Sequence, residues 1–206
     1  MRSSARSSNG RSRRSTAFRV LDIAEDVFAE RGFDATSLGD VANRVGIRQP
    51  SLYNHFGSKE ELYVAVLERL LDPFLEMVEG IALEGSAPEK TDRLIEELMS
   101  YYGQHPNLLR LIQHAVLSGS EHIDLLTERW FKPFLEKAQV LQARDEEHMP
   151  FVVMAFNSMM MGFVTLAPLY SGMFDMEPLA PQNLRTQIQV LKLFSSTLAA
   201  QQIRIP

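Results

Sequence analysis

Cysteine is absent from the 206 residues of this chain. Its absence excludes disulfides, thiolate zinc sites and cysteine nucleophiles. The sequence also lacks a run of eighteen uninterrupted apolar residues, so it predicts no transmembrane helix. The first fourteen residues are basic, but the apolar region of a secretory signal peptide does not follow them, so we expect no such signal. We therefore expect a cytoplasmic protein.

The motifs of several common enzyme classes are missing as well. There is no phosphate-binding Walker sequence, no G-x-S-x-G and no GxGxxG. His105, His114 and His122 are nine and eight residues apart, which does not fit a zinc-binding pair on one helix turn. We expect no metal, no cofactor and no enzymatic activity. The alternative is a helical ligand-binding protein or enzyme without a role on DNA.

Sustained alternation of apolar and polar residues, the mark of a half-buried strand, is scarce, and apolar residues instead recur at helical spacing. The sequence therefore predicts an all-α fold. Pro73 and Pro133 are expected to bend their helices. The predicted helices begin at residue 16 and then span about 38–45, 50–56, 59–83, 88–104, 107–117, 123–143, 150–170 and 181–201.

Charge is distributed unevenly along the chain. Residues 1–60 hold ten Lys/Arg and seven Asp/Glu, whereas residues 61–206 hold eleven and nineteen. A basic front suggests a polyanionic partner for that part alone. Residues 1–14 are predicted to be a disordered basic arm, which either solubilises the chain or contacts DNA phosphates and the minor groove. The remaining predicted domains are 15–62 and 63–206.

Residues 37–57 carry the signals of a helix-turn-helix. Ser37 stands at an N-cap with Asp40 three residues later, a near capping box. Gly46 falls where a left-handed residue must end the helix. Pro50 suits the first turn of the second short helix, because its missing N–H would be unbonded there. The preceding helix supplies a platform through Leu21, Ala24 and Phe28, which gives a three-helix unit that can present one helix to the major groove.

The outward side chains of the second short helix are all polar or able to hydrogen-bond. Gln and Asn can pair with adenine and Arg with guanine, while hydroxyls and lysine suit phosphate oxygens. A solvated helix surface is the alternative for any one of them, but the whole set favours DNA binding. The predicted DNA-binding residues are Ser37, Arg48, Gln49, Pro50, Ser51, Tyr53, Asn54, His55 and Lys59.

The stretches FAERGFDATSLGDVANRVGI and RQPSLYNHFGSKEELYVAVL resemble the DNA-binding region of the tetracycline-repressor (TetR) family. The resemblance covers residues 16–70. It implies a homodimer that binds a palindromic operator and is released by a small ligand. Family members often have Ser or Lys where Arg48 and Gln49 stand here, so the base preference need not match that of any relative.

The remainder of the chain predicts a ligand-binding and dimerisation domain. Methionine and phenylalanine are frequent between residues 149 and 176, and methionine adapts to irregular apolar ligands. We expect some of these residues to face a partner subunit and others a cavity, although core packing is the alternative for each. The candidate ligand-binding residues are Tyr102, His105, Leu109, Gln113, Trp130, Phe134, Met154, Asn157 and Met161.

The last predicted helix has a stripe with coiled-coil spacing. Its members recur at intervals of four and three, and we expect them to face a partner subunit. With the apolar helix at 150–170 they would form a four-helix interface between two protomers. The stripe comprises Leu184, Ile188, Leu191, Ser195 and Leu198.

Overall fold

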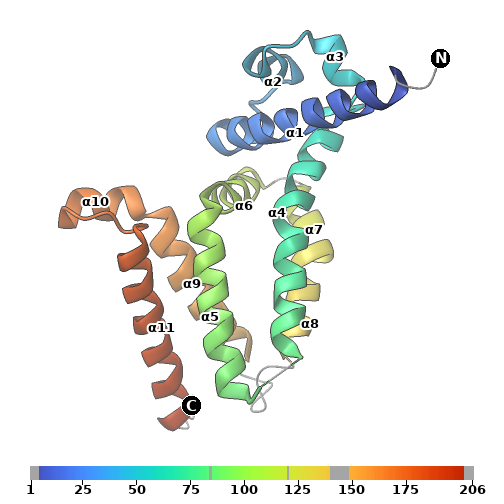
Figure 1. The fold of residues 1–206 in the computed structure, drawn as a ribbon. Helices are drawn as coiled ribbons and strands as arrows, with labels where there is room; N and C mark the ends of the chain where they lie inside the picture. Colours follow the sequence, from blue (N-terminus) through green and yellow to red (C-terminus); the bar gives the residue numbers. More distant parts are fainter. Residues whose placement is uncertain (1–4, 84, 120, 140–148, 202–206) are drawn as a thin grey trace. The chain divides into compact units, whose positions relative to one another are not determined.

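The computed structural model describes residues 5–83, 85–119, 121–139 and 149–201 (Figure 1). Helices are the regular structure of this described part, which contains no strand, so the all-α prediction is confirmed. The chain divides into two compact units, residues 1–70 with 110–120 and residues 71–109 with 121–206. The division runs through two helices, α4 (Lys59–Ala82) and α6 (Pro106–Ser118), and the domain boundary after residue 62 stays a prediction.

The first unit is built on α1 (Ala5–Arg31), α2 (Leu38–Val45) and α3 (Gln49–Tyr53). Its core joins the buried faces of these helices to the first turns of α4. The α1 platform is made by Val20, Ala24 and Phe28, whereas Leu21 is only half-buried. Phe28 meets the ring of Tyr63 edge-on at 5.0 Å, which ties α1 to α4.

Helix α1 extends further back than the sequence suggests. It begins at Ala5, so residues 5–14 of the predicted disordered arm are helical here, and residues 1–4 of that arm lie outside the described residues. Serine and arginine are tolerated in helices, so a helix held by packing from Val20 onward can propagate into such a segment.

The second unit pairs α5 (Ala87–Gln104) with α11 (Pro181–Gln201), which lie side by side in Figure 1. Leu191 and Ile188 are buried in this contact, and Gly103 lets Leu184 approach α5 closely, since an added Cβ would lie 2.8 Å from Leu184 Cδ1. Lys192 adds an ion pair with Glu96 of α5. Leu184, Ile188 and Leu191, three of the five residues predicted to face a partner subunit, therefore pack inside the chain, whereas Leu198 is 40% exposed.

A long helix predicted at 150–170 is broken in the structure. Helix α9 (Met149–Thr165) ends before Leu166, and α10 (Ala167–Phe174) follows at an angle of 66°. Pro168 explains the break, because it has no N–H and its ring excludes the carbonyl one turn earlier. No single described helix is long and apolar enough to span a membrane; α9 and α10 meet the length and composition test only as this bent pair.

The segment predicted as one helix over 123–143 is also divided. Helix α7 (His122–Leu126) leads into a π-helical turn, η1 (Thr127–Phe131), and then α8 (Lys132–Gln139); residues 140–143 lie outside the described part. The wider turn comes immediately before Pro133, where a regular hydrogen-bond ladder cannot continue. It directs Trp130 inward, where the indole N–H donates to Asp72 Oδ1 of α4 at 2.8 Å.

Candidate nucleic-acid interface

The turn between α2 and α3 is fixed by local hydrogen bonds. The Ser37 hydroxyl accepts from the Asp40 N–H at 3.1 Å, and the Asp40 carboxylate accepts from the Ser37 N–H at 2.9 Å, so the capping box is complete. The Ser37 hydroxyl also donates to Asp40 Oδ2 at 2.6 Å, and this bond, together with the one from the Ser37 N–H, holds the pKa of Asp40 below its usual range. At the other end Gly46 is left-handed (φ 79°), and the Ile47 N–H donates to Ala42 O at 2.9 Å. The direction in which α3 leaves α2 is thereby set.

Long-range contacts anchor α2 on α1. Arg44 forms a double hydrogen bond with Glu30 (2.5 and 2.8 Å), and this pairing lowers the pKa of the Glu30 carboxyl. Arg19 donates to the Val45 carbonyl at 3.1 Å. The Thr36 hydroxyl is buried and donates to Gly32 O at 2.7 Å. Sequence reasoning missed these positioning residues, because no local pattern connects positions that are far apart in the chain.

Helix α3 presents an exposed polar surface on this scaffold. Leu52 is fully buried beneath it, and Phe56 is buried just beyond its end. Tyr53 is half exposed, and His55 is partly exposed. The other outward residues of the predicted set are exposed, namely Arg48, Gln49, Pro50, Ser51 and Asn54.

Arg48 differs from the other basic residues of the unit. Among residues 16–70 it is the one Lys or Arg with neither a hydrogen bond nor an ion pair. Arg19 and Lys59 donate hydrogen bonds to the backbone carbonyls of Val45 and Phe33. The remaining three form ion pairs: Arg31 with Asp40, Arg44 with Glu30, and Arg69 with Asp22 and Glu25. A free guanidinium at the N-cap of α3 is available to a base edge or a phosphate.

Lys59 lies differently from what the sequence suggests. Its Nζ donates to the Phe33 carbonyl at 3.0 Å and lies 4.0 Å from the centre of the Phe33 ring. These contacts use Lys59 to join the start of α4 to the loop after α1. Its contact with a DNA phosphate stays a prediction.

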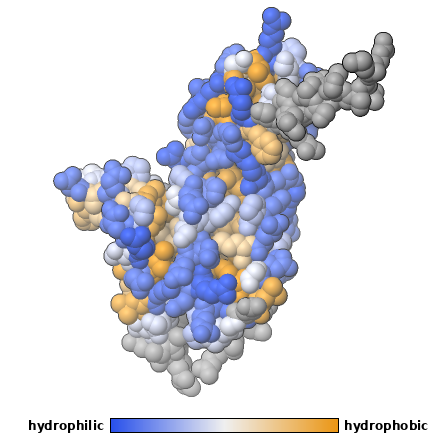
Figure 2. All heavy atoms as spheres, viewed as in Figure 1, coloured by the Kyte–Doolittle hydropathy of each residue, from blue (hydrophilic) through white to orange (hydrophobic). Residues whose placement is uncertain are grey.

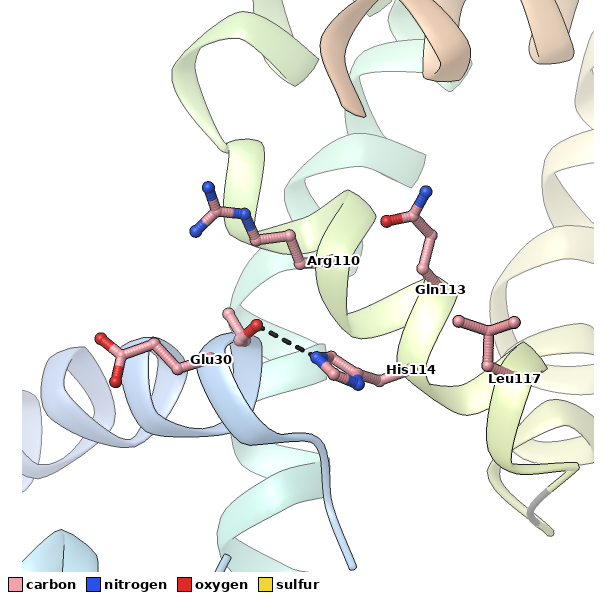
Figure 3. Close-up of a pocket in the computed structure, with 6 residues that line it drawn as sticks. Glu30, Arg110, Gln113, His114 and Leu117 are labelled. Atoms are coloured by element: carbon pink, nitrogen blue, oxygen red, sulfur yellow. Dashed lines mark hydrogen bonds between the residues drawn. The ribbon is translucent and has the colours of Figure 1, made fainter. Parts of the chain in front are cut away.

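A hollow of about 430 Å³ lies elsewhere on the same unit (Figure 3). The His114 ring of α6 reaches toward α1, where Nε2 lies 3.2 Å from Ala29 O. The ring fits because residue 32 is glycine, since a Cβ there would lie 3.0 Å from His114 Nδ1. Gln113, a predicted ligand-binding residue, lines this hollow with Glu30, Arg110 and Leu117.

Several other candidate ligand-binding residues gather in the second unit around Phe74 of α4. The Phe74 ring centre lies 6.2 Å from that of Tyr102 and 5.2 Å from that of Phe134. Trp130 and Leu109 are also buried, and His105 ends α5 with its ring 4.4 Å from that of Tyr101. On α9, Asn157 and Met161 are partly buried and Met154 is 55% exposed. Their binding of a ligand stays a prediction.

The geometry of α1–α3 is that of a helix-turn-helix DNA-binding protein. Residues 20–66 match the model of the bacterial regulatory proteins of the tetR family. This part of the chain is therefore similar to the DNA-binding domain of the TetR family, as the resemblance suggested.

Curated relatives match over part of the chain. The chain is 44% identical over 62 residues to the transcriptional activator FasR of Mycolicibacterium smegmatis, covering 30% of this chain and 27% of FasR. It is 42% identical over 77 residues to the transcriptional repressor KstR2 of Rhodococcus jostii, covering 37% of each. The matches thus span about a quarter to two fifths of these relatives, which are named as regulators and not as enzymes.

Solved structures share the fold over most of the chain. A TetR-like regulator from Rhodococcus sp. RHA1 superposes with a TM-score of 0.60 at 22% identity, over 86% of this chain and 91% of that one. FadR of Bacillus subtilis, solved with stearoyl-CoA, gives 0.57 at 18% identity, over 84% and 96%. The described helices after residue 70 therefore have the architecture found in such regulators.

Proposed function

We propose that this chain is a homodimeric transcriptional repressor that binds a palindromic operator through α3 and is released by a small, largely apolar ligand. The observation that supports DNA binding best is the exposed α3 surface. It is polar, it includes the free Arg48, and it stands on a domain that matches the family model. Because its target is DNA, we place the protein in the cytoplasm.

The first experiment is selection of bound DNA from a random pool, which yields the motif, its symmetry and the half-site spacing together. Fluorescence anisotropy on the selected site then compares Gln49→Ala with Gln113→Ala. Both glutamines are exposed residues of the first unit, but only Gln49 lies on α3. A lost base contact costs about 1–3 kcal/mol, so we expect roughly a tenfold or larger loss for Gln49→Ala.

Gln113→Ala should bind the selected site as wild type does. If no sequence is enriched, or if both variants bind the site equally well, the proposed role as a DNA-binding regulator is contradicted. A helical ligand-binding protein or enzyme without a role on DNA is then favoured.

Dimerisation is proposed through α9 and α11, by a face different from the stripe that the sequence indicated. Val190, Leu193 and Phe194 project from α11 on the side away from its buried residues, with exposed fractions of 40, 67 and 52%. Phe151 and Met154 are similarly exposed on α9. Figure 2 shows apolar surface on the side of this unit where these helices lie. Exposed apolar side chains that gather on one face are typical of a subunit interface.

We test the interface with Leu193→Glu, which would place a charge in the proposed contact. Sedimentation should show a dimer for the wild type and a monomer for this variant. The control is Leu117→Glu, because Leu117 is even more exposed (85%) but lies on α6. An unchanged dimer in Leu193→Glu would exclude this face.

The ligand response is proposed to follow a two-state scheme, in which the ligand binds better to the state that does not match the operator. Stearoyl-CoA, the ligand solved with FadR, is a reasonable first probe because it carries a long apolar chain. Saturating probe should weaken operator binding and raise transcription from an operator-controlled promoter. Lower transcription would instead indicate an activator.

A further inference from the structure

The buried Tyr102 in the second unit has a hydroxyl group that no described residue satisfies. Only 4% of its surface is exposed, and its ring packs against Phe74. Within the described part of the chain, the Tyr102 hydroxyl has no hydrogen-bond partner, whereas the neighbouring Tyr101 takes part in further contacts. Buried polar side chains in folded proteins are nearly always hydrogen-bonded, so an unpartnered one calls for an explanation.

This hydroxyl is not sealed inside the unit. Among the described residues, no side-chain N or O atom is both unpartnered and fully enclosed. The small accessible part of Tyr102 therefore includes its oxygen. This hydroxyl is available for a polar contact with a molecule that reaches it.

The surroundings define the chemistry of that contact. Burial raises the pKa of Tyr102 well above its ordinary value, and no charged group contributes to the shift. The phenol therefore keeps its proton and acts as a hydrogen-bond donor, which suits an acceptor oxygen on a ligand. The neighbouring rings of Phe74 and Phe134 offer an apolar contact on the same side of the unit.

We propose that Tyr102 recognises an uncharged hydrogen-bond acceptor, such as a carbonyl oxygen, on an otherwise apolar effector. The inference rests on the proposed ligand response and specifies its chemistry. It makes Tyr102 the residue that distinguishes a ligand with a carbonyl from a hydrocarbon chain of the same length.

The test uses two matched probes, stearoyl-CoA and S-octadecyl-CoA, in which the thioester carbonyl is replaced by a methylene group. Binding is followed by the emission of Trp130, the single tryptophan of the chain, which is buried in the same unit. One hydrogen bond is worth about 0.5–1.5 kcal/mol, so the wild type should bind the thioester roughly 2- to 10-fold more tightly. Tyr102→Phe should remove this preference, and the control Tyr101→Phe should retain it.

The unliganded protein gives a second readout. Because the hydroxyl has no protein partner, Tyr102→Phe should leave Tm unchanged or raise it. A clear fall in Tm would reveal a structural partner and overturn the inference. If wild type and Tyr102→Phe bind both probes equally well, the inference fails while the proposed ligand response stands. If neither probe binds the wild type, the inference about Tyr102 and the proposed ligand response both fail. DNA binding by α3 is tested separately, by binding to the selected DNA site.

Discussion

The turn of the helix-turn-helix allows a sharp test of how backbone conformation specifies this domain. Gly46 has φ 79° and ψ 33°, and a Cβ built on it meets nothing within 4 Å. Replacement by alanine would therefore cause no steric clash beyond the residue itself. The cost of Gly46→Ala is then the strain of a left-handed residue with a side chain, about 1–2 kcal/mol, which is partly offset because alanine restricts the unfolded chain.

Gly39 provides the matched control in the same helix. It has no positive φ, and a Cβ there would make only ordinary contacts, 3.5 Å from Ser37 Oγ and 3.6 Å from Gln49 Oε1. Alanine should therefore stabilise α2 by up to about 0.5–1 kcal/mol, because it restricts the unfolded chain more than glycine does. The same substitution, seven residues apart, is expected to have opposite signs.

Urea denaturation followed by far-UV circular dichroism measures both free energies of unfolding. Gly46→Ala should lower the midpoint and Gly39→Ala should leave it unchanged or raise it. Equal shifts of the same sign would refute the argument, because they would show that backbone conformation at residue 46 does not decide the outcome.

Two further predictions concern side chains that join α1 to α4 in the first unit. Burial raises the pKa of Tyr63 from 10.0 to about 12, so its contribution to stability should be constant below about pH 10 and be lost between about pH 10 and 12. Tyr102, whose pKa burial also raises, adds to the loss above pH 10, so Tyr63→Phe should lose less stability over this range than the wild type, and an equal loss would contradict the prediction. Arg69 bridges Asp22 and Glu25, and Glu25 is the better buried partner (16% against 68% exposed). Arg69→Met should therefore cost about 1–3 kcal/mol, because the partly buried Glu25 carboxylate would lose its hydrogen bond to the guanidinium. The control is Lys132→Met, which removes the exposed ion pair with Glu128 and should lower the free energy of unfolding by at most about 0.5 kcal/mol. Urea denaturation measures both variants, and an equal loss of stability in Arg69→Met and Lys132→Met would contradict the prediction.

Local patterns were sufficient to predict the helix-turn-helix. A capping box, a left-handed glycine and a proline in the first helical turn each act over a few residues, so Ser37, Gly46 and Pro50 can be read without knowing the rest of the fold. The same holds for the buried Leu52 and the exposed side chains of α3. Most helix limits followed for the same reason.

Tertiary structure decided which partner each surface meets. The spacing of Leu184, Ile188 and Leu191 specifies a stripe on α11 but not its neighbour, and the structure places that stripe against α5. Similarly, the sequence marks both Arg48 and Lys59 as basic residues near α3, whereas only the folded chain leaves Arg48 free and engages Lys59 with Phe33. Periodicity and composition fix what a surface is made of; the contacts between residues far apart in the chain fix what it touches.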